Sequence, residues 1–424
     1  MENGLIIGYD LTKDYCRISY FEQGEDEPRD VAFSEGAIPY IIQNSICKKK
    51  GTDEWLVGHE AYETALLGGG SIVDKLLLLI ARKGFTTFEG VRYSAEDLFY
   101  HYLEETLNVL YRESGRKEIE SLVFTVQELD SVVLDTIMST CKQLGIERKK
   151  VHIISHTECF LYYGISRKRD LWSNMSVLYD FSGDGLNYYE LEVLRGMQPN
   201  AASAKRHFLE EGFSIDILDT EKGHKMADTI MASCVERTLA KKLVSSVYLS
   251  GNGMNNCQVW GDRFLKTLCT RRKVFFVENL FAKGAVYAGL EILREESAYP
   301  FRIMCEGRTR VDIRMDVNKG MTQQTVVMAE AGSNWYETKS EFDIIPDQET
   351  TLRLKVKKFG DRYPCDVTVP FNEIIEKRGN KLTRIGISLK FISENAFMLT
   401  LRDKGFGELF PATEATIFKT YTIE

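Results

Sequence analysis

Three short glycine-bearing turns carry residue types suited to holding a phosphate group. They cover residues 8–13, 180–185 and 249–253, and each follows a short apolar segment of strand-like composition. Glycine lets backbone N–H groups approach an anion closely, and a carboxylate just beyond a strand can hold Mg²⁺ through water. Asp10 and Asp180 place such a carboxylate in the first two turns. Taken singly, each turn is more often an ordinary tight turn, so their order and context decide their meaning.

The elements that must position these turns alternate between strand and helix patterns over residues 1–295. Ser94 is a predicted N-cap, with Asp97 three residues on, and Gly145 is a predicted left-handed helix end. The expected strands are 5–7, 15–21, 122–126, 151–155, 176–181, 188–194, 247–249 and 274–277, and the expected helices begin at 94 or cover 129–144, 159–163, 205–218, 221–242, 255–269 and 279–294. This alternation predicts an α/β domain with helices on the sheet faces, although no internal repeat is visible in the sequence.

Residues 296–424 have a different hydrophobic pattern, in which helical periodicity gives way to the alternation typical of short strands. The expected strands are 311–317, 325–330, 350–357, 365–369, 385–392, 396–402 and 416–422. Turns such as those at 318–320 and 359–361 separate them. The pattern predicts a separate all-β sandwich domain.

The composition excludes several classes of protein. Of the 424 residues 44% are hydrophobic and 27% charged, which is ordinary for a globular chain and unlike a disordered or collagen-like one. The formal net charge of −8 argues against nucleic-acid binding. Nine dispersed cysteines without a C-x-x-C pair predict free thiols, and no signal or membrane-spanning segment is visible, so a cytoplasmic location without membrane insertion is expected.

In their order, the three turns resemble the two phosphate motifs and the adenosine motif of the actin, sugar-kinase and heat-shock-chaperone superfamily. The resemblance is nearest to DnaK-type heat-shock chaperones. Asp10-Leu11-Thr12-Lys13-Asp14 stands where that family has D-L-G-T-T, the segment from Asp180 to Gly185 is similar to its D-L-G-G-G-T, and Gly251-Asn252-Gly253 is similar to its G-G-S turn.

The second half of the chain extends the resemblance to the client-binding domain of these chaperones. Asp347-Gln348-Glu349-Thr350 resembles the family's D-N-Q-T strand start, and Asp403-Lys404-Gly405-Phe406-Gly407 resembles its D-K-G-x-G. The implied architecture is an actin-like, nucleotide-binding-type α/β domain over 1–295, followed by a β-sandwich over 296–424.

The resemblance also assigns roles to individual residues. It implies that Asp10 and Asp180 hold Mg²⁺ waters and that Lys75, with Asp180, serves catalysis. The implied nucleotide contacts come from the turns: Asp10, Thr12, Lys13, Gly183, Gly185, Gly251 and Gly253. ATP and Mg²⁺ are the implied cofactors, and a polypeptide is the implied partner.

Departures from the family pattern lie at the site itself. Thr12 replaces a glycine, where its Cβ would crowd a phosphate, while Asp14, Ser182 and Asp184 add charge or bulk to the turns. The segment between Asp180 and residue 248 is too short for the subdomain that forms one wall of the family's adenine pocket. The family's acidic-capped leucine linker and its helical lid are also missing from the pattern.

Two functions therefore remain open. One is a DnaK-like protein that binds polypeptide partners, with weak or vestigial ATP handling and at most slow ATPase activity. The other is a non-catalytic scaffold, a pseudoenzyme that keeps the fold without binding nucleotide. A small-molecule kinase fits poorly, because such enzymes lack the sandwich. His152 and His156 have no third ligand nearby in the sequence, so a structural role is expected for them.

Overall fold

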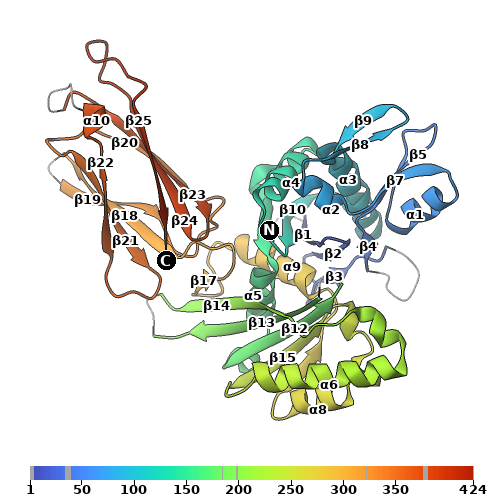
Figure 1. Ribbon diagram of the computed structural model, residues 1–424. Coiled ribbons are helices and arrows are strands. Elements are labelled where there is room, and N and C mark those ends of the chain that lie inside the picture. The colour runs from blue at the N-terminus through green and yellow to red at the C-terminus, as the bar shows by residue number, and fades with distance from the viewer. Residues whose placement is uncertain are drawn as a thin grey trace. The chain divides into compact units, whose positions relative to one another are not determined.

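The computed structural model describes residues 4–33, 40–183, 185–196, 199–320, 322–375 and 381–423 (Figure 1). The chain divides into two compact units. The first, here called the α/β unit, comprises Met1–Leu194 and Ala202–Pro300. The second, the β unit, comprises Arg195–Ala201 and Phe301–Glu424. Its main segment begins close to residue 296, where the sequence predicts the second domain.

The first sheet of the α/β unit is built around a central hairpin. Its order is β11-β10-β1-β2-β3, with β4 also paired to β2. The strands are β1 (Leu5–Leu11), β2 (Tyr15–Phe21), β3 (Arg29–Asp30), β4 (Ile42–Gln43), β10 (Ile119–Val126) and β11 (Val151–Ser155). β1 runs antiparallel to β2 and parallel to β10, and β10 runs parallel to β11.

The second sheet repeats this plan. Its order includes β16-β15-β12-β13-β14, with β12 antiparallel to β13 and parallel to β15, and β15 parallel to β16. The strands are β12 (Met175–Ser182), β13 (Gly185–Leu194), β14 (Ala201–Leu209), β15 (Val244–Ser250) and β16 (Lys273–Phe276). The structure thus contains a repeat of strand order that no sequence repeat reveals.

One sequence expectation for this sheet is wrong. The sequence predicts a helix over 205–218, but β14 (Ala201–Leu209) occupies the first part of this segment and a short 3-10 helix, η3 (Ile215–Asp219), the last part. β14 is the third strand of a meander, hydrogen-bonded to β13. Pairing with a neighbouring strand outweighs the weak helix propensity of this polar segment.

Helices follow the strands of both sheets. They are α3 (Ala95–Ser114), α4 (Ser131–Gln143), α5 (His156–Ser166), α6 (Glu221–Thr238), α7 (Cys257–Trp260), α8 (Asp262–Cys269) and α9 (Leu280–Ile292). The expected capping box is present at Ser94 and Asp97, and Gly145 has the expected left-handed φ of 76°. Smaller elements in the first half are β5 (Ile46–Lys49), β6 (Trp55–Val57), α1 (Gly58–Leu66), β7 (Gly70–Val73), α2 (Leu76–Ala81), β8 (Phe85–Phe88) and β9 (Val91–Ser94).

Helices α5 and α9 pack against each other between the two sheets (Figure 1). Although α9 follows the last strand of the second sheet, it lies on β1, β2 and β10 of the first, while α5 contacts β13. Glycines allow this close packing. A Cβ on Gly284 would lie 2.3 Å from the carbonyl oxygen of Cys159, and one on Gly8 would lie 2.0 Å from that of Ala282.

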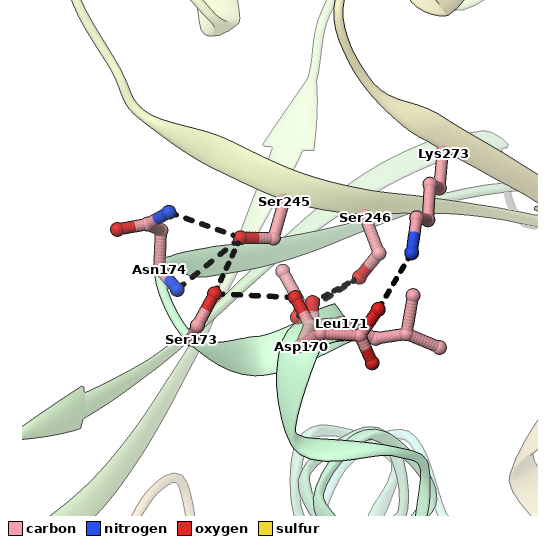
Figure 2. A network of polar contacts seen from close by, with 8 residues as sticks. Asp170, Leu171, Ser173, Asn174, Ser245, Ser246 and Lys273 are labelled. Carbon is pink, nitrogen blue, oxygen red and sulfur yellow. Dashed lines mark hydrogen bonds and ion pairs between the residues drawn. The ribbon is translucent and has the colours of Figure 1, made fainter.

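A polar network fixes the amino-terminal ends of the second sheet's parallel strands (Figure 2). Ser176 of β12 and Ser246 of β15 both donate to the carbonyl oxygen of Leu171, at 3.0 and 2.8 Å. Lys273, the first residue of β16, donates to Asp170 Oδ2 at 2.6 Å. The opposite, carboxyl ends of β12 and β15 lead into two of the three glycine turns.

The β unit consists of two four-stranded sheets, with the orders β19-β18-β21-β22 and β20-β23-β24-β25. The strands are β18 (Val311–Lys319), β19 (Thr322–Ala329), β20 (Lys339–Ile344), β21 (Thr351–Lys358), β22 (Cys365–Pro370), β23 (Ile385–Ser393), β24 (Ala396–Asp403) and β25 (Thr416–Thr422). Buried residues of both sheets form one hydrophobic core. A short strand β17 (Arg302–Met304) and helix α10 (Asn372–Ile375) complete the unit, and β20 was not expected from the sequence.

No helix in the described part of the chain is long and apolar enough to cross a membrane. All nine cysteines are free thiols.

Candidate functional site

The carboxylate of the first turn is held by a histidine. Asp10, near the end of β1, is fully buried, and His156 Nε2, from the first residue of α5, donates to its Oδ1 at 2.7 Å. The imidazole stacks on Phe281 of α9, with ring centroids 4.0 Å apart. Asp10 Oδ2 has no hydrogen-bond partner among the described residues. One oxygen of the expected Mg²⁺ ligand is thus already occupied by a protein donor.

The first turn is closed on itself by Thr12 and by Asn44. Thr12 Oγ1 donates to the carbonyl oxygen of Tyr15 at 2.8 Å, so its hydroxyl is used inside the hairpin. Asn44 Nδ2 donates to the carbonyl oxygen of Thr12 at 2.6 Å, and its backbone N–H donates to that of Asp14 at 2.8 Å. Tyr102 in turn donates to Asn44 Oδ1 at 2.8 Å. These contacts fix the turn without a ligand.

The second and third turns meet around Asp180, which is 6% exposed on β12. Gly251 has φ +91° and ψ 157°, and a Cβ there would lie 2.3 Å from the carbonyl oxygen of Phe181 and 2.8 Å from Asp180 Oδ1. A Cβ on Gly253 would lie 2.2 Å from the Phe181 ring. Both glycines are therefore required by close packing between the two turns.

The first turn lies beside the other two. Asp14 Oδ2 is 3.8 Å from the place where a Cβ on Gly183 would stand. Arg17, which faces Asp10 across the β1–β2 hairpin, donates from Nη2 to Asn252 Oδ1 at 2.7 Å. Gly185 begins β13 with φ +99°, and Asp184 lies outside the described residues. The structure therefore brings together three turns that are far apart in the sequence.

Lys75 is not brought onto the two aspartates. It is exposed, with a left-handed φ of 53°, at the start of α2, and its side chain makes no hydrogen bond or ion pair to Asp10 or Asp180 in the described structure. The next residue, Leu76, donates its backbone N–H to the carbonyl oxygen of Asn44 at 3.2 Å, which places this segment near the first turn. Lys13 is exposed on the first turn itself.

Buried neutral groups lie on the face of the β1–β2 hairpin opposite to Asp10. Burial, opposed in part by hydrogen bonds from Tyr102 and Tyr9, raises the pKa of Cys16 to about 12. The hydroxyl oxygen of Tyr102 lies 3.2 Å from its Sγ. The Cys16 thiol is therefore protonated at neutral pH and offers no nucleophile.

A cavity of about 50 Å³ lies beside the third turn and Arg17, and no residue of the first two turns lines it. Its lining includes Arg17, Gly251, Asn252, Asn255 and Asn279. Pockets that hold drug-sized ligands are about 300–1,000 Å³, so the cavity is far too small for ATP. No group of three His, Cys, Asp or Glu side chains arranged for a metal ion occurs among the described residues. Asp10 Oδ2 could accept one Mg²⁺ water, but the arrangement does not fit the Mg²⁺–ATP that the resemblance implies.

Sequence reasoning missed three residues of this site: Arg17, Asn44 and His156. His156 was expected to be structural, and nothing in its neighbourhood in the sequence pointed to Asp10. Arg17 carried a usable signal, because it is a charged residue between Cys16 and Ile18 in an otherwise apolar strand, and it is 6% exposed.

Two family models match the chain. One, described as the C-terminal part of a family of unknown function (DUF5716), matches residues 27–306, and the other, a domain of unknown function (DUF8552), matches residues 308–423. No curated protein matches the chain.

Proposed function

The chain belongs to the DUF5716 family, and we propose that it is a non-catalytic relative of the actin and DnaK-type chaperone fold that binds other polypeptides without using ATP. Of the two functions that the sequence left open, this is the scaffold alternative. The α/β unit would be the actin-like part and the β unit the sandwich. The repeated strand order of the two sheets supports the fold assignment.

One observation carries the proposal: side chains at the turns are held by hydrogen bonds within the protein. His156 binds Asp10, and Arg17 reaches across to Asn252. Thr12 replaces the glycine that phosphate approach requires, and its hydroxyl is committed to Tyr15. Preorganised contacts of this kind must be broken before a triphosphate can enter, and that loss is subtracted from the binding free energy.

The short segment between β14 and β15 also supports a protein that does not use ATP, because the related family places there the subdomain that encloses the adenine base. Between β14 and β15 the described residues contain only η3 and α6, and α6 packs against α8. No further lobe is described in this stretch that could enclose a base.

Polypeptide binding is proposed for the β unit. β25 forms one end of its sheet, so one side of this strand carries no neighbouring strand in the described structure. Phe418, on the same strand, is 62% exposed. An unpaired strand edge with an apolar side chain suits the addition of an extended peptide.

Calorimetric titration with Mg²⁺–ATP tests the nucleotide half of the proposal. No saturable heat is expected at millimolar nucleotide, either with the wild-type chain or with the Asp10→Ala variant. Binding by the wild type that disappears in Asp10→Ala would overturn the proposal and restore the ATP-handling alternative.

Fluorescence anisotropy with labelled extended peptides tests the binding half. We expect measurable binding with fast release, weakened by Phe418→Asp, which places a charge on the strand edge. Glu414→Gln, in the loop before β25, is a matched control and should bind as the wild type does. Equal binding by Phe418→Asp would remove β25 as the contact site.

A further inference from the structure

The last strand of the second sheet is uncovered, whereas its counterpart in the first sheet is covered. β11 and β16 occupy the same position in the strand orders of the two sheets, each at one end. In β11 every side chain but one is buried, and the strand packs against α4 and α5. In β16 no side chain is buried, and Phe275 and Phe276 are 37% and 43% exposed. The same position in the repeated plan is thus closed in one sheet and open in the other.

The backbone of β16 has hydrogen-bonding groups along its outer edge. The N–H of Val277, just after the strand, donates to the carbonyl oxygen of Leu249 in β15 at 2.9 Å. Because the N–H and C=O groups of successive residues alternate in direction along a strand, those of Phe275 also point to β15. Those of Val274 and Phe276 therefore point away from the sheet, where no strand of the described structure pairs with them. Such an edge is a template for a further strand.

The charge that usually protects an edge strand is engaged within the chain. Lysine on an edge strand normally discourages pairing with another strand. In β16 this residue is Lys273, which forms an ion pair with Asp170 at the amino-terminal end of the strand (Figure 2). The rest of β16 consists of Val274, Phe275 and Phe276, so it presents apolar side chains beside its unpaired edge.

We infer that β16 pairs with β16 of a second copy of this chain, in an antiparallel and two-fold symmetric arrangement centred on Phe275. In this register Phe275 lies opposite itself, and Val274 lies opposite Phe276 of the partner subunit. Pairs of two aromatic residues, or of an aromatic and a β-branched residue, stabilise neighbouring strands. The outward N–H and C=O groups of Val274 and Phe276 also meet, as an antiparallel hydrogen-bonded pair requires.

Charges just beyond the ends of the strand favour this register. Counted from Phe275, Arg272 lies opposite Glu278 of the partner subunit, and the two-fold axis creates this pair twice. Glu278 is exposed, and Arg272 is half-buried, with Nη1 donating to a carbonyl oxygen of α8 and five N–H donors in its guanidinium. A register centred on Val274 would place Arg272 opposite Phe276. A register centred on Phe276 would place Glu278 opposite Val274. Of the three registers, the one centred on Phe275 matches the two charges.

The dimer is expected to be transient, because each strand has four residues. Interfaces below about 1,200 Å² are typical of weak complexes, so we expect a dissociation constant of about 100 μM.

Sedimentation equilibrium of the full chain, over about 10 to 500 μM, tests the inference. The wild type should show a reversible equilibrium between monomer and dimer. Phe275→Asp places two like charges directly opposite each other, so it should weaken dimerisation about tenfold or more. Phe418→Asp is the matched control, because it makes the same change at an exposed phenylalanine of β25, and it should dimerise as the wild type does.

An exchange of charges tests the register. Arg272→Glu and Glu278→Arg each place like charges opposite one another, so each should weaken dimerisation about threefold or more. The double variant Arg272→Glu/Glu278→Arg restores opposite charges and should recover the wild-type affinity. Losses that the double variant does not recover would refute this register.

Disulfide trapping tests the centre of the pairing. The variants carry Cys269→Ser, because Cys269 is an exposed thiol close to β16 in the chain. Phe275→Cys then places two thiols at a non-hydrogen-bonded pair, whose Cα atoms are about 4.5 Å apart and so within reach of a disulfide. Oxidation should give covalent dimers. Phe276→Cys, at a similarly exposed position of the same strand, lies opposite Val274 and should give few.

Three results would overturn the inference. They are a wild-type chain that stays monomeric at about 500 μM, a dimer that Phe275→Asp leaves unchanged, and equal trapping through positions 275 and 276. If Phe275→Asp fails to fold, the exchange of charges between Arg272 and Glu278 still decides. The inference does not rest on the proposed function, because β16 belongs to the α/β unit and its pairing needs neither a nucleotide nor β25.

Discussion

Two buried carboxylates, one in each unit, differ in how completely the chain satisfies them. Asp403 of the β unit is 2% exposed and accepts four hydrogen bonds: Thr383 Oγ1 and the Gly405 N–H donate to Oδ1, and the Thr413 N–H and Oγ1 donate to Oδ2. Asp10 of the α/β unit is fully buried and accepts one, from His156.

The contrast separates a structural aspartate from a site residue. Burial alone would raise the pKa of Asp403, but the hydrogen bonds outweigh that effect and lower it to about 2. Both carboxylate oxygens are satisfied by groups of the β unit, so the residue needs no partner from outside it. By contrast, Asp10 Oδ2 has no hydrogen-bond partner among the described residues, and neither has Nε of the neighbouring Arg17. Unsatisfied buried groups are where a ligand or an ordered water contributes most.

The largest expected effect is that of His156→Leu. It leaves the Asp10 carboxylate buried without any donor, and leaving a buried charged group without its hydrogen-bond partner costs about 3 kcal/mol or more. Chemical denaturation should show this loss in the free energy of unfolding. The double variant Asp10→Asn/His156→Leu should regain part of it, because no charge is then left unpaired. A loss below about 1 kcal/mol would mean that water reaches Asp10 after all.

Asp403→Asn should cost less, about 2 kcal/mol. The asparagine oxygen can still accept from Thr383 and Gly405, but the new amide N–H₂ would face the backbone N–H donor of Thr413. Hydrogen-exchange protection of β23 and β24 should fall, with little change in the α/β unit. Asp366→Asn, on the exposed surface of β22, is the matched control. Equal protection in the two variants would contradict the structural role.

The pH dependence of Asp403 gives a smaller effect with a defined sign. Its folded pKa of about 2 is lower than the ordinary value of 3.8, so its contribution is complete above about pH 4 and is lost as the pH falls towards 2. The stability difference between the wild type and Asp403→Asn should therefore shrink by about 1–2 kcal/mol over this range. Denaturation of both proteins at pH 6 and pH 2.5 measures it. A difference that does not change with pH would refute the assignment.

The smallest effect belongs to the contact between Arg17 and the third turn. Asn252→Ala removes a partly exposed acceptor of the guanidinium and should cost about 1 kcal/mol. In a double-mutant cycle, Arg17→Gln and Asn252→Ala should show a coupling energy of similar size. Additive losses would show that this hydrogen bond does not couple the β1–β2 hairpin to the third turn.

The local elements of this fold can be predicted from the sequence, and the long-range contacts cannot. The hairpin of β1 and β2, the capping box at Ser94 and seven strands of the β unit follow from alternation, caps and turns. The helix expected over 205–218 is wrong, because pairing with β13 makes the first part of that segment a strand. The contacts of Asp10 with His156 and of Arg17 with Asn252 join residues 146 and 235 positions apart. Only the folded chain specifies such pairs, and they decide what the turns can bind.

Two glycines, Gly8 in β1 and Gly284 in α9, determine how closely α9 packs on its neighbours. At Gly8 and Gly284 the helix backbone touches a strand and a second helix with no side chain between them. A single methyl group at position 8 would clash with the α9 backbone, and one at position 284 would clash with the α5 backbone. Any substitution at residue 8 or 284 must therefore push α9 away from β1 or from α5.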